Sequence, residues 1–330
     1  ARDGARAFYE GAPANEIVAL LNARGGRHTL EDFAAFEPEY VRPVSTSYRG
    51  IEVFECPPNG QGVTALVMLN ILEGFDLARF DPLGPERFHL EAEATRLAFR
   101  ERDRLIADPA QAEVPVDALI SKERAARLRG AIDMTRALER LPPSLVPGYP
   151  DTVYLAVVDG EGNAVSFINS LFHGFGSGLF APGCGVMLHN RGASFSLEPG
   201  HPNALAPRKR PLHTIMPALA MKQGKALMPF GVVGGHYQPV GQVHVLCNML
   251  DYGMDPQEAI DCPRGFSFEG LYALEAGVPE ATATALRARG HPIARANEPL
   301  GGGQAIWIDR ARGVLIGGSD SRKDGCALGL

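Results

Sequence analysis

The sequence has 330 residues, of which 45% are hydrophobic and 21% charged, and its formal net charge is −6. These values are typical of a soluble globular protein with one large domain or two smaller ones. The negative charge leaves no broad basic surface for nucleic acid or an anionic membrane, and no apolar run reaches the roughly 18 residues of a membrane span. The expected partner is therefore a small molecule.

The cysteines and histidines show no metal-binding pattern. The five cysteines are Cys56, Cys184, Cys247, Cys262 and Cys326, and none of them has the C-x-x-C spacing of a zinc site. Their odd number and scatter argue against a disulfide framework and favour a cytoplasmic over a periplasmic location. His189 and His201 have no partner at metal-ligand spacing. We therefore expect no metal and no cofactor.

The chain before residue 140 is predicted to contain several helices and one hairpin. Apolar spacing predicts helices over 15–25, 60–75, 85–108 and 116–138, and alternation predicts a hairpin over 44–56. Thr29 to Asp32 has the pattern of a capping box that opens a further short helix. The charged residues of the 85–108 helix are expected to be solvated.

A linker and a group of strands follow. Residues 141–151 contain four prolines and can be neither helix nor inner strand. Two apolar strands over 153–158 and 164–172 have the pattern of a sheet covered on both faces. A strand pair is predicted over 218–221 and 226–233, helices over 241–252 and 256–261, and a hairpin over 305–318. Strands flanked by helices favour a four-layer α/β sandwich.

Thr152 follows the linker and opens the first of these strands. A threonine at such a position is usually there because β-branched residues favour strands. It could instead cut its own chain at the Asp151–Thr152 bond and then use the freed α-amine as its base. Two glycines in the loop 230–239, Gly234 and Gly235, could present backbone amides to an oxyanion, or could simply form a tight turn.

A third segment, residues 209–217, places His213 and Thr214 between two prolines. A polar pair fixed in a rigid loop suits contact with a ligand, although a hydrogen-bonded structural pair is the simpler interpretation.

Seven motifs together carry a resemblance to a known family. They are RDGARAFYEG (2–11), PPNGQG (57–62), DTVYLAVVDGEGNAVS (151–166), FGSG (175–178), KRPLHTIMP (209–217), VVGGHYQPVGQ (232–242) and SDSRKDG (319–325). In this order, and over the whole chain, the sequence resembles the gamma-glutamyltranspeptidase family of N-terminal nucleophile hydrolases. The resemblance implies an αββα sandwich whose precursor splits itself into a large subunit, here residues 1–151, and a small subunit, residues 152–330.

The resemblance also implies roles for single residues. Thr152 matches the nucleophile and first residue of the small subunit, and Ser170 matches the hydroxyl that hydrogen-bonds it and assists self-cleavage. Gly234 and Gly235 match the pair whose amides form the oxyanion hole. His213 and Thr214 stand where the family has a serine pair that contacts the substrate carboxylate.

Four departures from the family pattern bear on the substrate. Transpeptidases have an acidic residue in the stretch matching residues 191–194, where it pairs with the substrate α-amine; here no acid is present, and Arg191 would favour a carboxylate instead. Phe172 replaces a polar residue, and the segment between Phe195 and Lys209 is too short for the lid of some members. Relative to the family, an N-terminal part of the large subunit, with its carboxylate-clamping arginine, is also absent.

The leading prediction is a self-processing amide hydrolase that cleaves γ-glutamyl compounds such as glutathione, or similarly placed carboxylate-bearing amides. Water or an amine would accept the acyl group, transfer being secondary, and the two subunits could assemble as a dimer of heterodimers. One alternative is an acylase for amides without an α-amine, of the oxamate or glutaryl-cephalosporin type. Another is a truncated, non-catalytic remnant.

Overall fold

A computed structural model of the protein describes residues 4–138 and 150–329, so most of the proline-rich linker lies outside the described residues. The helices are α1 (Arg6–Tyr9), α2 (Ala12–Asn22), α3 (Leu30–Ala34), α4 (Gly62–Leu72), α5 (Pro85–Leu105), α6 (Val116–Leu119), α7 (Lys122–Arg129), α8 (Gln238–Tyr252), α9 (Pro256–Asp261) and α10 (Glu280–Ala288). Short 3-10 turns are η1 (Leu77–Arg79), η2 (Arg191–Ser194) and η3 (Gly235–Tyr237). Within the described residues, no helix combines the length and apolar character needed to cross a bilayer.

The strands are β1 (Val44–Tyr48), β2 (Ile51–Glu55), β3 (Pro150–Val158), β4 (Ala164–His173), β5 (Phe180–Ala181), β6 (Val186–Met187), β7 (Ala218–Lys222), β8 (Lys225–Val233), β9 (Gly265–Phe268), β10 (Leu271–Leu274), β11 (Ile293–Arg295), β12 (Gly302–Asp309) and β13 (Val314–Ser319). Six of them form the central antiparallel sheet, in the order β1-β2-β7-β8-β12-β13. The hairpins predicted over 44–56 and 305–318 and the strand pair around 222 are confirmed.

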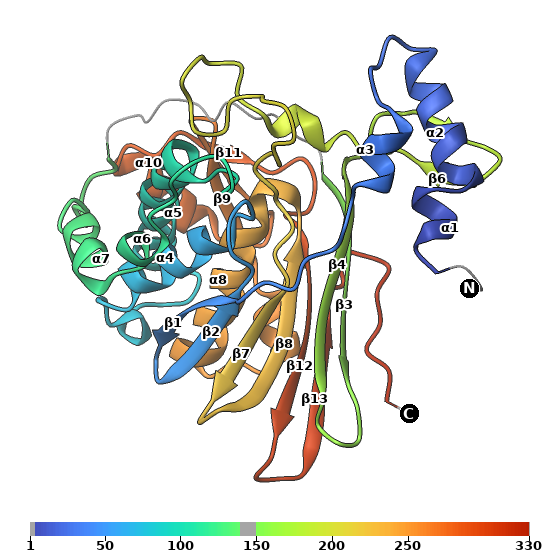
Figure 1. The fold of residues 1–330 in the computed structure, drawn as a ribbon. Helices are drawn as coiled ribbons and strands as arrows, with labels where there is room; N and C mark the ends of the chain where they lie inside the picture. Colours follow the sequence, from blue (N-terminus) through green and yellow to red (C-terminus); the bar gives the residue numbers. More distant parts are fainter. Residues whose placement is uncertain (1–3, 139–149, 330) are drawn as a thin grey trace.

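Helices α4, α5 and α8 lie together beside this sheet (Figure 1). Every residue of α4 is buried, because its sequence is apolar on all sides and it packs among α5, α7, α8 and β1. Leu66 and Met68 are fully buried, and each such side chain contributes about 1.5–3 kcal/mol of transfer free energy. The predicted capping box of α3 is confirmed: Thr29 Oγ1 accepts from Asp32 N, and Asp32 Oδ2 accepts from Thr29 N.

Two predictions for the helical part need correction. The helix predicted over 116–138 is two short helices, because the Ser121 hydroxyl caps α7 from an extended backbone that ends α6. The charged residues of α5 are not all solvated: Arg87 and Glu91 form a buried ion pair, and Glu91 also lies 3.1 Å from His244 of α8. The sequence patterns also do not predict β9, β10 and β11, which are too short to show alternation.

The hairpin of β3 and β4 forms a second sheet that packs across β8 and β12 of the first (Figure 1). Tyr154 points inward, and a Cβ on Gly231 would lie 2.4 Å from its ring, so the close approach of β3 to β8 requires glycine there. The opposite face is exposed, which corrects the prediction of a sheet covered on both faces. Its apolar side chains are 43–66% accessible: Val153, Leu155, Val157, Val165 and Phe167.

Candidate active site

Thr152 lies near the start of β3, where this strand pairs with β4. Its Oγ1 donates a hydrogen bond to Ser170 Oγ at 3.0 Å, and Phe172 N donates to the same serine oxygen at 2.9 Å. The β3–β4 register shifts between Asp151 and Thr152, so the ladder is irregular at the predicted cleavage bond. The structure thus brings together the two predicted hydroxyls, while their catalytic roles stay predictions.

Gly234 and Gly235 form the turn between β8 and α8. Their φ angles of +132° and +56° lie in the region that favours glycine. Within the described residues neither amide is hydrogen-bonded to a protein acceptor. Strand β3 contacts η3, so this turn lies beside the strand that carries Thr152. Both amides therefore have a donor that no described protein group uses, and their orientation toward Thr152 Oγ1 remains a prediction.

His213 and Thr214 lie in a loop that is tied to the PPNGQG segment by hydrogen bonds. Gln61 N donates to His213 O, and His213 N donates to Asn59 O, both at 2.9 Å. Asn59 Nδ2 also donates to Pro211 O at 2.7 Å. Because prolines keep both segments out of regular structure, these bonds are what fix the positions of His213 and Thr214.

Arg191 begins η2 and is only 4% exposed. Its Nη1 donates to Thr214 Oγ1 at 2.6 Å, and its Cζ lies 4.3 Å above the centre of the Phe172 ring. Burial lowers the pKa of Arg191 to about 10, so the guanidinium stays charged at neutral pH. Arg191 therefore contacts both Thr214, the other predicted substrate-binding residue, and Phe172, which replaces a polar residue of the family pattern.

The histidines near Arg191 are neutral at physiological pH. Burial first, and then the charges of Arg191 and His189, lower the pKa of His213 to about 3. Partial burial and Arg191 also lower the pKa of His189. Since Ile215 N donates to Nδ1 of His213, the neutral ring carries its proton on Nε2. Of these three side chains, only Arg191 carries a charge at neutral pH.

Two residues that sequence reasoning missed join these segments. Gln61 Nε2 donates to Thr214 O at 2.8 Å and to Gly235 O at 2.9 Å, so one buried amide holds both the Thr214 loop and the glycine turn. Arg102 of α5 donates from Nη1 to Gln61 Oε1 at 3.0 Å and lies at the same distance from His236 Nδ1. The signal in the sequence was a polar residue, Gln61, between two glycines and directly before a mostly apolar helix.

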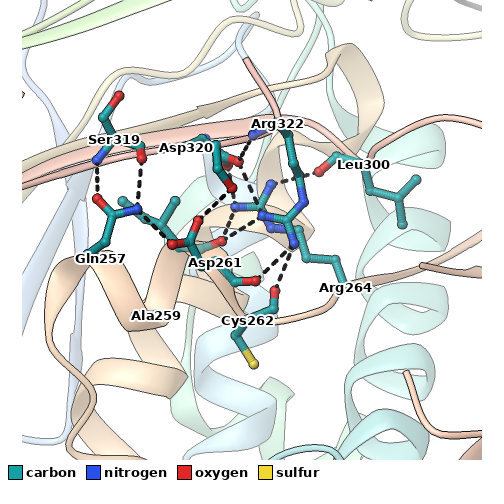
Figure 2. A network of polar contacts seen from close by, with 12 residues as sticks. Gln257, Ala259, Asp261, Cys262, Arg264, Leu300, Ser319, Asp320 and Arg322 are labelled. Atoms are coloured by element: carbon teal, nitrogen blue, oxygen red, sulfur yellow. Dashed lines mark hydrogen bonds and ion pairs between the residues drawn. The ribbon is translucent and has the colours of Figure 1, made fainter. Parts of the chain in front are cut away.

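The C-terminal SDSRKDG motif supports the glycine turn from behind. Asp320 and Gly303 exchange two hydrogen bonds, Gly303 N to Asp320 Oδ2 at 2.6 Å and Asp320 N to Gly303 O at 3.0 Å. Arg264 Nη2 donates to the same carboxylate at 2.6 Å (Figure 2). The adjacent Gly301 is so close to Gly234 that a Cβ on Gly234 would lie 3.1 Å from its Cα. The motif thus fixes the backbone against which the turn packs.

A group of potential metal ligands lies elsewhere. Among the described residues, His89, Glu93 and His291 bring ligand atoms within 4.8 Å of one another. His89 Nδ1 lies 2.7 Å from His291 Nε2, while Glu93 accepts from Arg96 and from Leu138 N. The His89–His291 contact and the hydrogen bonds to Glu93 join α5 to neighbouring segments. We therefore interpret these three residues as a structural contact and not as a metal site.

Comparison with known proteins places the chain in a family. The family model for Gamma-glutamyltranspeptidase matches residues 1–330. The Glutathione hydrolase-like YwrD proenzyme of Bacillus subtilis (strain 168) is 42% identical over 340 residues, which cover 100% of this chain and 64% of the relative. The Oxamate amidohydrolase proenzyme of Klebsiella pneumoniae subsp. pneumoniae is 35% identical over 339 residues, covering 100% and 63%.

A solved structure is similar as well. The crystal structure of cephalosporin acylase from Bacillus halodurans matches with a TM-score of 0.89 and 42% identity, over 97% of this chain and 59% of that one. This chain therefore spans between 59% and 64% of the length of these three relatives. The predicted fold is confirmed as the αββα sandwich of the N-terminal nucleophile hydrolases. The chain belongs to the gamma-glutamyltranspeptidase family.

Proposed function

We propose that the protein is a self-processing amide hydrolase whose nucleophile is Thr152. The observation that carries the proposal is the hydrogen bond from Thr152 Oγ1 to Ser170 Oγ at the irregular Asp151–Thr152 step of β3. The contact of β3 with the glycine turn supports it, since a nucleophile and an oxyanion-binding group must lie together. Relatives named as proenzymes support a maturation step.

Self-cleavage would begin when Thr152 Oγ1 attacks the carbonyl carbon of Asp151. Ser170 Oγ accepts the hydroxyl proton, which then passes to the leaving amide nitrogen. The C–N bond breaks as an ester forms on Oγ1, and water hydrolyses this ester. The products are a carboxylate on Asp151 and a free α-amine on Thr152, which divide the chain into residues 1–151 and 152–330.

Turnover would use the new α-amine as the general base. Its unperturbed pKa of about 7.7–8.0 suits proton transfer at neutral pH. Thr152 Oγ1 loses its proton to the amine and attacks the substrate amide, and the oxyanion accepts hydrogen bonds from the amides of Gly234 and Gly235. The amine product leaves with the proton, and water hydrolyses the acyl-enzyme. An amine acceptor in place of water would give transfer.

The substrate class is an amide whose acyl group bears a carboxylate, which includes the γ-glutamyl amides implied by relatives named as glutathione hydrolases. Arg191 and Thr214 are the proposed contacts for that carboxylate, with neutral His213 beside them. Two subunits cut from one precursor form the active unit, and a dimer of heterodimers is the expected assembly.

Processing is tested by intact mass under denaturing conditions together with N-terminal sequencing. We expect two polypeptides whose junction is Asp151–Thr152, and we expect Thr152→Ala to remain a single inactive chain. Thr152→Ser is the matched control, because it keeps a hydroxyl and should still cut. One uncut wild-type chain of 35.3 kDa without amidase activity would identify a non-catalytic remnant. Cleavage that persists in Thr152→Ala would assign the cut to another protease.

A further inference from the structure

Glu55 ends β2 as a buried carboxyl group without a hydrogen-bond partner. Its side chain lies on the same face of the strand as Ile51 and Val53 and is only 1% exposed. Within the described residues, neither Oε1 nor Oε2 has a hydrogen-bond partner. Burial, as the single cause, raises the pKa of Glu55 well above its usual value. The group therefore stays a neutral acid to a higher pH than an exposed glutamate does.

The carboxyl group lies against the first turn of α4, where two backbone amides are unused. A Cβ on Gly62 would lie 2.7 Å from Glu55 Cβ and 2.9 Å from Glu55 Oε2, so glycine allows β2 and α4 to approach this closely. Gly62 and Val63 are the first two residues of the helix, and in the part of the chain that the structure describes neither N–H donates to an acceptor. The acid thus lies beside a helix N-terminus whose donors it does not use.

The ionisable groups around Glu55 give it no cation to pair with. Helix α4 contains no ionisable side chain. Burial and then Glu55 raise the pKa of Cys56, and the pKa of Tyr154 on β3 is raised by burial and, to a smaller extent, by Glu55. Arg102 of α5 donates to Gln61 Oε1 and not to Glu55. The free amides of α4 are therefore the donors closest at hand for an ionised Glu55.

Gln61, directly before Gly62, connects this turn to the candidate site. Its Nε2 donates to Thr214 O at 2.8 Å and to Gly235 O at 2.9 Å, and its backbone N donates to His213 O at 2.9 Å. A shift of the first α4 turn would therefore move the Thr214 loop and the glycine turn with it. These are the segments proposed to bind the substrate carboxylate and the oxyanion.

We propose that Glu55 is a positioning residue whose protonation state decides where the first turn of α4, and with it Gln61, lies. A carboxylate is strongly attracted to free amides at a helix N-terminus, through charge-assisted hydrogen bonds and the helix dipole. By accepting from Gly62 N and Val63 N, the ionised form would gain partners and pull the turn away from the arrangement that Gln61 holds. For its effect on catalysis this inference rests on the proposed function.

The first measurement compares urea unfolding of wild type and Glu55→Gln from pH 4 to pH 9. Glutamine keeps the shape of the neutral acid, and Glu52→Gln, on the exposed face of the same strand, is the matched control. Because the native pKa lies above the unfolded value of about 4.3, wild type should lose stability relative to Glu55→Gln as the pH rises from there to the native pKa. The ratio of their unfolding constants should grow up to about tenfold per pH unit in this interval. A constant ratio overturns the inference.

The second measurement tests positioning, which burial of an acid alone would not produce. With γ-glutamyl anilide as the substrate, the kcat/KM of Glu55→Gln divided by that of wild type should rise about tenfold or more over the same pH interval, because displaced oxyanion donors lower the rate. The titration of the α-amine cancels in this quotient. A constant quotient beside a growing unfolding ratio would make Glu55 a buried acid without a positioning role and would overturn the inference.

The side-chain amide of Gln61 gives a readout without chemistry. Its ¹⁵N NMR signal, identified by its loss in Gln61→Met, should shift with pH in wild type and stay constant in Glu55→Gln. If it does so while no Thr152-dependent turnover occurs, the coupling stands and the proposed function falls. If turnover depends on Thr152 and this signal does not shift in wild type, the proposed function stands and the coupling falls.

Discussion

Replacing Asp320 by asparagine should destabilise the protein strongly and impair the site. The side chains of Asp320 and Arg264 are both fully buried, and Asp320 Oδ2 accepts from Arg264 Nη2 and Gly303 N, both at 2.6 Å. Asparagine keeps the shape but removes the charge and replaces one acceptor oxygen with a donor. Arg264 is then a buried cation that has lost its carboxylate.

The expected loss is about 3–5 kcal/mol of unfolding free energy, the range measured when one partner of a buried ion pair is removed. Although burial raises it, the pKa of Asp320 is held below its usual value by Arg264 and by backbone amides of Arg322 and Gly303. A lowered native pKa adds stability above the unfolded pKa of about 3.9. The difference from wild type should therefore be full at pH 7 and shrink as the pH falls below about 4.

Urea unfolding at pH 7 and pH 3 measures this difference, with Asp117→Asn on the exposed start of α6 as the control. The rate of chain cleavage, followed by denaturing gel electrophoresis, should fall too, because Gly301 packs on Gly234. A loss below 1 kcal/mol at pH 7, or one that grows toward pH 3, would refute the reasoning.

Three further predictions concern the site itself. Gly234→Ala should lower kcat about 10²–10³-fold, since φ +132° suits glycine and the amide would be displaced; an unchanged kcat in a folded variant would contradict this. The pH profile of kcat/KM should show a single rise, near the α-amine pKa of about 7.7. His213, with a pKa of about 3, stays neutral and adds no second rise. A second rise between pH 5 and 7 that disappears in His213→Asn would contradict this prediction. Gln61→Met should cost about 1–3 kcal/mol in urea unfolding, because the carbonyls of Thr214 and Gly235 lose the amide that donates to them and Arg102 loses one of its acceptors. Exposed Gln111→Met should cost far less.

Local patterns predicted the elements that depend on local chemistry. The capping box of Thr29 and Asp32 depends on only four consecutive residues, and helix α4 can be predicted from its apolar composition. Contacts between segments far apart in the chain have no comparable local sequence pattern. The ion pair of Arg87 and Glu91 is buried because α8 covers it, more than a hundred residues further along the chain, so α5 could not be distinguished from a solvated helix.

For the candidate site, too, some residues could be predicted from the sequence and others only from the structure. Thr152 and the glycine pair could be named from motifs and Ser170 from its position in the family resemblance, and the structure places Thr152 and Ser170 in hydrogen-bond contact. The function of Gln61 as a link between two loops depends on which carbonyls the fold brings to its amide. That information is geometric, and no residue type reveals it.

The alternation of β3, with Thr152 and Tyr154 on the inner face and Val153 and Leu155 outside, ties maturation to correct folding. A slip of one residue in the pairing with β4 would turn the Thr152 hydroxyl outward and bring Val153 into its place. On the proposed mechanism such a molecule could not cut itself. The fraction of chains that remain uncut after prolonged incubation would then equal the fraction of molecules with a misregistered β3–β4 hairpin. The cleavage reaction would thus report on the strand register.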